Sequence, residues 1–268
     1  MEVAVAQLSS SLDKAANRDL AVETVRAAAA DGASLVVLPE AMMADFGEAD
    51  LDLTELAEPL YGPFVKALTR AAADTGATVV AGMFEPATGE ARVYNTTVVV
   101  APEGHIGAYR KFHLFDALGR RESARIKPGS PATDEIVVFK CGDHIVGVMT
   151  CFDLRFPEMG RTLVDLGATL LVVPAQFFQG PGKEETWRIL LRARAIENTV
   201  YVAGAGKPGP ECIGHSMIVD PLGEVLAELD GDEQGVARAD VSVDTVKETR
   251  SSMPVLENRR FVVRAKGI

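Results

Sequence analysis

The stretch MTCFDLRFPE at residues 149–158 places a cysteine where an apolar strand gives way to a helix. The preceding residues Ile145–Met149 form the apolar run of a buried strand, and Pro157 suits the first turn of a helix, where its missing N–H costs nothing. We therefore expect Cys151 beside free backbone N–H groups and a positive helix end, which stabilise a thiolate and an oxyanion formed next to it. For this segment alone, a buried structural cysteine is the alternative.

Two further apolar segments end in residues that fit the chemistry of a cysteine nucleophile. Glu40 ends the run that begins at Ser34, and a poorly solvated carboxylate there suits a general base that takes a proton from a thiol and later from water. Lys111 interrupts another apolar stretch and can neutralise negative charge on a tetrahedral intermediate. Taken singly, each residue also fits an ordinary cap or a solvated face. Together with Cys151 they indicate a Glu-Lys-Cys site.

These residues resemble the nitrilase superfamily of carbon–nitrogen hydrolases, in which a Glu-Lys-Cys triad occurs in the same chain order. The resemblance covers nearly the whole chain. The segments that carry it outside the triad are 3–7, the hairpin 104–110, the helix 187–198 with LRARAIEN at its end, Gly214-His215-Ser216 and 219–224.

The resemblance implies a role for each matching residue. Cys151 is the nucleophile, Glu40 the proton acceptor and donor, and Lys111 the cation that stabilises the oxyanion together with the backbone N–H of Phe152. Glu122, within the sequence RES at residues 121–123, matches a second glutamate that many members use to support the base and the lysine. The implied reaction runs through a cysteine thioester and needs no cofactor.

The residues after Cys151 and the RES sequence are most similar to the Nit branch, which contains omega-amidases and deaminated-glutathione amidases. The expected activity is therefore hydrolysis of a linear amide in a small carboxylate-bearing substrate, such as the 2-oxo acid monoamide 2-oxoglutaramate or deaminated glutathione. An N-carbamoyl hydrolase or an acyltransferase with the same triad is an alternative. A binding or regulatory protein without turnover is another, and the intact triad argues against it.

Two residues are candidates for substrate binding. Arg155 follows Cys151 by one helical turn, so its guanidinium could hold a substrate carboxylate in a bidentate contact. An internal ion pair of Arg155 with Asp153 or Glu158 is an equal alternative. Phe177 could wall the acyl pocket, although an aromatic residue after a strand is as often part of the core.

Composition and charge exclude several classes of partner. The 268 residues include 27 basic and 38 acidic ones, and the net charge of -11 argues against binding to nucleic acid. The three cysteines form no Cys-x-x-Cys pair and the four histidines no His-x-x-x-His pair, so we expect neither disulfides nor a metal site. The chain opens without an export signal and has no apolar run of membrane-spanning length. We expect a cytoplasmic enzyme with no membrane association.

Strands and helices alternate along the chain, for example strands at 78–82 and 94–101 and helices at 62–75 and 184–198. This pattern alone leaves a doubly wound sheet or a barrel. The resemblance instead implies an α/β fold with four layers, an alpha-beta-beta-alpha sandwich, formed by one domain over residues 1–268. It also implies a homodimer or higher homo-oligomer in which the tail 254–268 reaches a partner subunit. A tail folded on its own subunit is the alternative.

Overall fold

Two sheets of six strands each form the centre of the fold in the computed structural model, which describes residues 1–130 and 136–264. The first sheet has the order β12 (Gly235–Asp240), β1 (Glu2–Gln7), β2 (Leu35–Val37), β3 (Thr78–Pro86), β4 (Val93–Ala101) and β5 (Gly104–Arg110). The second has the order β11 (Val225–Glu228), β10 (Met217–Val219), β9 (Tyr201–Gly206), β8 (Leu170–Ala175), β7 (His144–Val148) and β6 (Val138–Cys141). In each sheet the central strands are parallel and the outer pairs antiparallel.

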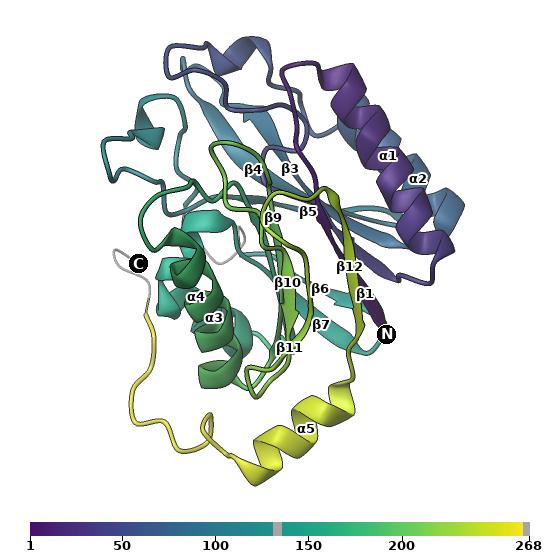
Figure 1. The fold of residues 1–268 in the computed structure, drawn as a ribbon, viewed down its shortest axis with the longest axis vertical. Helices are drawn as coiled ribbons and strands as arrows, with labels where there is room; N and C mark the ends of the chain where they lie inside the picture. Colours follow the sequence, from purple (N-terminus) through teal and green to yellow (C-terminus); the bar gives the residue numbers. More distant parts are fainter. Residues whose placement is uncertain (131–135, 265–268) are drawn as a thin grey trace.

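Helices cover the outer face of each sheet, as Figure 1 shows. The pair α1 (Lys14–Ala30) and α2 (Pro63–Thr75) packs on the first sheet, and the pair α3 (Pro157–Asp165) and α4 (Lys183–Asn198) packs on the second. The four-layer alpha-beta-beta-alpha sandwich is therefore confirmed. The alternation of strands and helices is also confirmed, with ends that differ from the expected ones by a few residues.

Local sequence explains where these helices begin and end. The carboxylate of Asp13 accepts hydrogen bonds from the first amides of α1. Helices α2 and α3 begin with Pro63 and Pro157, and Gly76 ends α2 in the left-handed conformation that glycine adopts without strain. In the part of the chain that the structure describes, no helix has the length and apolar character needed to cross a membrane.

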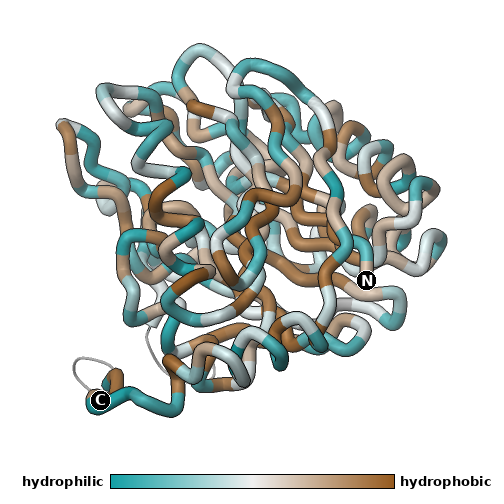
Figure 2. Tube along the Cα trace, turned by 60° about the horizontal axis from the view of Figure 1, so that its bottom comes forward, coloured by the Kyte–Doolittle hydropathy of each residue, from teal (hydrophilic) through white to brown (hydrophobic). Residues whose placement is uncertain are grey.

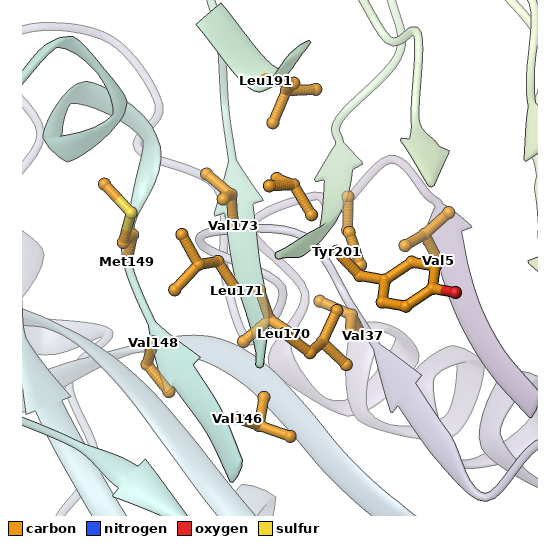
Figure 3. Close-up of a cluster of buried hydrophobic side chains, with 14 of the residues drawn as sticks. Val5, Val37, Val146, Val148, Met149, Leu170, Leu171, Val173, Leu191 and Tyr201 are labelled. Carbon is orange, nitrogen blue, oxygen red and sulfur yellow. The ribbon is translucent and has the colours of Figure 1, made fainter. Parts of the chain in front are cut away.

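The inner faces of the two sheets pack against each other. Strand β1 contacts β9 and strand β2 contacts β8, and Figure 3 shows Val5 and Val37 of the first sheet beside Leu170 and Tyr201 of the second. The tube in Figure 2 accordingly has its most hydrophobic stretches in the interior. Because burying one such aliphatic side chain stabilises a fold by roughly 1.5–3 kcal/mol, this interface fixes the position of both sheets and of the loops at their ends.

The C-terminal segment leaves the sandwich after β12 as α5 (Val243–Ser252). Arg259 in the tail forms an ion pair of 2.7 Å with Asp165 of its own subunit. Phe261 and Val262 are 90% and 76% exposed. The tail's contact with a partner subunit stays a prediction, as do the single domain over 1–268 and the oligomer; residues 265–268 lie outside the described residues.

Candidate active site

The three residues of the predicted triad follow strands that end around one cavity. Glu40 comes after β2, Lys111 directly after β5, and Cys151 after β7. Strands β2 and β5 run in the same direction, so their carboxyl ends lie at the same edge of the first sheet. All three residues line a cavity of about 620 Å³ at this edge. The fold therefore brings together Glu40, Lys111, which lies 71 positions later in the chain, and Cys151, which lies a further 40 positions on.

Lys111 lies between two carboxylates. Its side chain is 2% exposed, and its Nζ donates to Glu40 Oε1 at 2.9 Å and to the two carboxylate oxygens of Glu122 at 3.0 and 3.1 Å. Burial by itself lowers the pKa of Lys111, but the negative charges of Glu122 and Glu40 outweigh it and hold that pKa well above its usual value. Lys111 is a cation throughout the neutral range. Glu122 thus stands beside the base and the lysine, where the resemblance placed it.

Glu40 receives two further hydrogen bonds that hold its carboxylate in place. Asn95 Nδ2 donates to Oε1 at 2.7 Å, and the backbone N–H of Gln176 donates to Oε2 at 2.7 Å. Asn95 also donates to Glu122 at 3.1 Å. The sequence interpretation did not include Asn95 or Gln176. Their only signal in the sequence is a buried amide inside or just after an otherwise apolar strand, which does not reveal the partner.

Gly82 of β3 allows the backbone at Glu40 to lie close to this strand. A Cβ at Gly82 would stand 2.5 Å from the backbone N of Ala41 and 2.7 Å from Cα of Glu40. Such distances are too short for non-bonded atoms, so any side chain at position 82 must push Glu40 away. Ala41 itself has a φ of 54°, which shows how tightly the chain turns after the carboxylate.

We expect Gly82→Ala to lower kcat/KM by about 10²-fold, because a base displaced by about 1 Å loses its alignment with the thiol. The same substitution is expected to reduce the free energy of unfolding by about 1–3 kcal/mol through overpacking. Steady-state kinetics and denaturant unfolding measure both effects. Gly235→Ala in β12 is the matched control, since its Cβ meets only side-chain atoms of Leu229 at 3.6 Å or more. Equal changes of kcat/KM and of the free energy of unfolding in the two variants would contradict the role given to Gly82.

Cys151 begins a short 3-10 helix, Cys151–Arg155, with a φ of 48°. For a residue other than glycine this is a strained conformation, and it turns the thiol into the cavity. Burial raises the pKa of Cys151 well above its usual value, and the charge of Glu40 raises it further, although Lys111 acts in the opposite direction. Burial and the two carboxylates therefore outweigh the stabilisation of a thiolate that we expected from the helix end. Ionisation of Cys151 requires a proton acceptor, as the sequence interpretation expected of Glu40.

The fully buried Asp153 carboxylate holds the turn that presents Cys151. It accepts hydrogen bonds from the Thr150 backbone N–H at 2.9 Å and from the Tyr109 hydroxyl at 2.7 Å. Its other oxygen lies 2.7 Å from Nδ1 of His113. Because Tyr109 belongs to β5, this network connects the strand that carries the lysine with the turn that carries the cysteine. Both oxygens of the Asp153 carboxylate are occupied by these contacts. In the described residues, Asp153 forms no ion pair with Arg155.

The two predicted substrate-binding residues have different positions. Phe177 is buried and lines the cavity. Arg155 is exposed, its guanidinium carbon lies 6.0 Å from the Phe177 ring centre, and it is absent from the described residues that form the cavity wall. Besides Lys111, the described cavity wall contains four other basic residues: Arg120, Arg121, Arg125 and Lys183.

The remaining thiols and the acidic residues show no arrangement typical of a metal centre. Cys141 and Cys212 are buried free thiols. Across residues 1–130 and 136–264, no group of three or more His, Cys, Asp or Glu side chains is placed to hold a metal ion. That the reaction needs neither a metal nor a cofactor stays a prediction.

The sequence profile of the carbon-nitrogen hydrolases matches residues 2–251. The chain belongs to this family. Among the similar proteins, Hydrolase Rv0480c of Mycobacterium tuberculosis is 39% identical, with 97% of this chain and 95% of that protein covered. Deaminated glutathione amidase of Escherichia coli O157:H7 is 36% identical over 91% and 92% of the two chains. Omega-amidase NIT2 of Xenopus tropicalis is 34% identical over 92% and 90%. This carbon-nitrogen hydrolase is therefore an enzyme that acts on amides.

Solved structures have the same fold. Saccharomyces cerevisiae Nit3, described as a member of branch 10 of the nitrilase superfamily, superimposes with a TM-score of 0.85 at 28% identity, with 97% of each chain covered. A mutant of the amidase from Nesterenkonia sp. AN1, with acrylamide added at its active-site cysteine, gives a TM-score of 0.80 at 26% identity over 95% of this chain and 98% of that one. The membership in the nitrilase superfamily, expected from the sequence, is confirmed.

Proposed function

We propose that this amidohydrolase cleaves the amide of a small carboxylate-bearing substrate through a thioester on Cys151. The observation that carries the proposal is the joint position of Glu40, Lys111 and Cys151 on one cavity wall, with the lysine held between two carboxylates. The substrate class is supported by the relatives named deaminated glutathione amidase and omega-amidase. A nucleophilic cysteine is supported by the amidase whose active-site cysteine carries acrylamide.

The raised pKa of the Cys151 thiol determines how the first step runs. Because the thiol does not ionise on its own near neutral pH, its proton passes to Glu40 as the sulfur attacks the amide carbon. Glu40 then gives this proton to the departing nitrogen, and ammonia leaves. In the second half Glu40 takes a proton from water, the hydroxide adds to the thioester, and the acid is released as the proton returns to Cys151.

The charge balance of the site explains why Lys111 stabilises the oxyanion. Before attack, its ammonium is held by Glu40 and Glu122. When Glu40 takes the thiol proton, it becomes neutral and its hold on the ammonium weakens. The negative charge on the carbonyl oxygen appears at the same moment, so the ammonium gains a new partner without a change in the total charge of the site. The backbone N–H of Phe152, another residue of the cavity wall, is the proposed second donor.

Ammonia release from a set of substrates tests the proposal. The set contains 2-oxoglutaramate, deaminated glutathione measured by its cleavage products, an uncharged amide, an N-carbamoyl amino acid and a nitrile. We expect turnover of the two acidic amides and little of the nitrile. Preference for the N-carbamoyl compound, or transfer to an added amine in place of water, would identify the alternative enzymes. No turnover of any compound by folded protein would support a binding protein.

Among the three thiols, we expect Cys151 to react first with iodoacetamide at neutral pH. Burial raises the pKa of all three thiols, but Cys151 alone among them lines the described cavity and has Glu40 beside it to take its proton. Peptide mapping after brief treatment, with activity followed in parallel, measures the order. Loss of activity that coincides with labelling of Cys141 or Cys212, while Cys151 stays free, would show that the nucleophile is misassigned.

A further inference from the structure

Lys183 is a buried cation in the wall of the same cavity. It is the first residue of α4, it is only 7% exposed, and it lies with Cys151 among the residues that enclose the cavity. Its Nζ lies 4.3 Å from the ring centre of Phe177 and 5.0 Å from that of Phe115. Within residues 1–130 and 136–264, no carboxylate forms an ion pair with this ammonium and no acceptor forms a hydrogen bond with it.

The other buried or partly buried charges of the cavity wall are occupied. Lys111 is held by Glu40 and Glu122, as described above. The remaining contacts are those of Asp45 with Lys207, of Arg120 with Glu211 at 3.3 Å, and of Arg125 with the backbone carbonyls of Phe46 and Glu48. Arg121 is exposed to solvent. Lys183 is thus the buried charge of the described wall that has neither an ion pair nor a hydrogen bond.

Folding alone gives no reason for an ammonium at this position. Burial lowers the pKa of Lys183, and the neighbouring charge of Arg155 lowers it further. The first position of a helix also disfavours a cation, because the helix dipole is positive there. The two aromatic rings compensate only in part, since a cation near a ring gains about 0.5–2 kcal/mol. An anion entering the cavity would relieve all of these unfavourable terms at once.

We propose that Lys183 binds the carboxylate of the substrate and so determines the preference of this enzyme for acidic amides. This inference rests on the proposed function and adds the residue that recognises the acid. Phe115 and Phe177 lie beside the ammonium, and their apolar rings leave it fewer contacts with water, which strengthens a contact with an anion. Arg155, whose guanidinium carbon lies 6.0 Å from the ring centre of Phe177, adds positive potential but is not among the described residues of the cavity wall.

The first test compares two substrates in one variant. Lys183→Met keeps most of the side-chain volume and removes the charge. We expect kcat/KM for 2-oxoglutaramate to fall by at least about 30-fold, because removing one partner of a desolvated charge pair has effects of this size or larger. An uncharged amide of similar length should lose less than about threefold. Arg155→Met is the matched control. It should leave the ratio of kcat/KM for the acidic amide to kcat/KM for the uncharged amide nearly unchanged.

The second test measures binding without turnover. In the Cys151→Ala background, calorimetry with glutarate, a dicarboxylate of similar size, should give a Kd at least about 30-fold higher when Lys183 is replaced by Met. The melting temperature of Lys183→Met should equal or exceed that of the parent, because burial, Arg155 and the helix dipole disfavour the ammonium and the two aromatic rings compensate only in part. Lys183→Gln provides a second variant for both measurements if the methionine variant does not fold.

The outcomes separate this inference from the proposed function. Equal losses on acidic and uncharged amides, unchanged binding of glutarate, or a selective loss in Arg155→Met in place of Lys183→Met would overturn the role of Lys183. If the parent enzyme turns over none of the amides, measured by ammonia release or by the cleavage products of deaminated glutathione, the proposed function is rejected instead, and the binding of glutarate would still decide whether Lys183 holds a carboxylate.

Discussion

Replacing Lys111 by methionine is expected to lower kcat/KM by about 10³-fold or more and the free energy of unfolding by about 3–5 kcal/mol. The first effect follows because Lys111 is the proposed cation of the oxyanion site. The second follows because Glu40 and Glu122, with side chains 1% and 9% exposed, would remain buried without the cation between them. Steady-state kinetics on an acidic amide and denaturant unfolding at neutral pH measure the two effects.

A double variant separates catalysis from stability at this position. Adding Glu122→Gln to Lys111→Met removes one of the two orphaned carboxylates, so part of the lost stability should return. Activity should not return, because the oxyanion still lacks its cation. If Lys111→Met is folded and keeps near wild-type turnover, Lys111 has no role in the reaction. If the double variant regains turnover, the defect of the single variant lies in the orphaned charge.

The sequence was sufficient to find the triad because each member stands at the end of an apolar segment. Strands β2 and β7 are short apolar segments, a pattern typical of buried strands. Glu40 and Cys151 stand out because each follows one of these segments. For the fold, the alternation of strands and helices left a single sheet or a barrel possible. It does not say which face of a sheet meets another sheet, and the resemblance decided in favour of the sandwich.

The residues that form hydrogen bonds with the triad could not be predicted in the same way. Asn95 meets Glu40 across 55 positions of the chain, and the backbone of Gln176 meets it across 136. The order of the strands within the first sheet determines the first pair, and the packing of one sheet on the other determines the second. The raised pKa of Cys151 could not be predicted for the same reason, since burial and the approach of Glu40 are properties of the folded chain. Lys183 was not singled out because its helix begins with an ordinary charged run in the sequence, KEE.

Replacing Glu40 by glutamine is expected to slow both formation and hydrolysis of the thioester by at least about 10²-fold. The side chain keeps its shape but no longer accepts the proton of Cys151 or of water. Its amide also presents NH₂ either to the two donors Lys111 and Asn95 or to the backbone N–H of Gln176, so at least one donor loses its acceptor in either orientation. That mismatch should lower the free energy of unfolding by about 1–3 kcal/mol.

The pH dependence of Glu40→Gln distinguishes a missing base from a general disturbance of the site. Without Glu40, attack depends on the small fraction of thiolate, and burial still holds the pKa of Cys151 above its usual value. The acylation rate of Glu40→Gln should therefore rise by about tenfold for each pH unit above neutrality, while the wild type stays nearly flat. Glu122→Gln is the matched control: it removes a charge from the same lysine, but Glu122 acts on Cys151 through its charge alone, whereas Glu40 is the proposed proton acceptor. It should keep the flat profile. A flat profile in Glu40→Gln, measured by single-turnover thioester formation, would assign the proton transfer to another group.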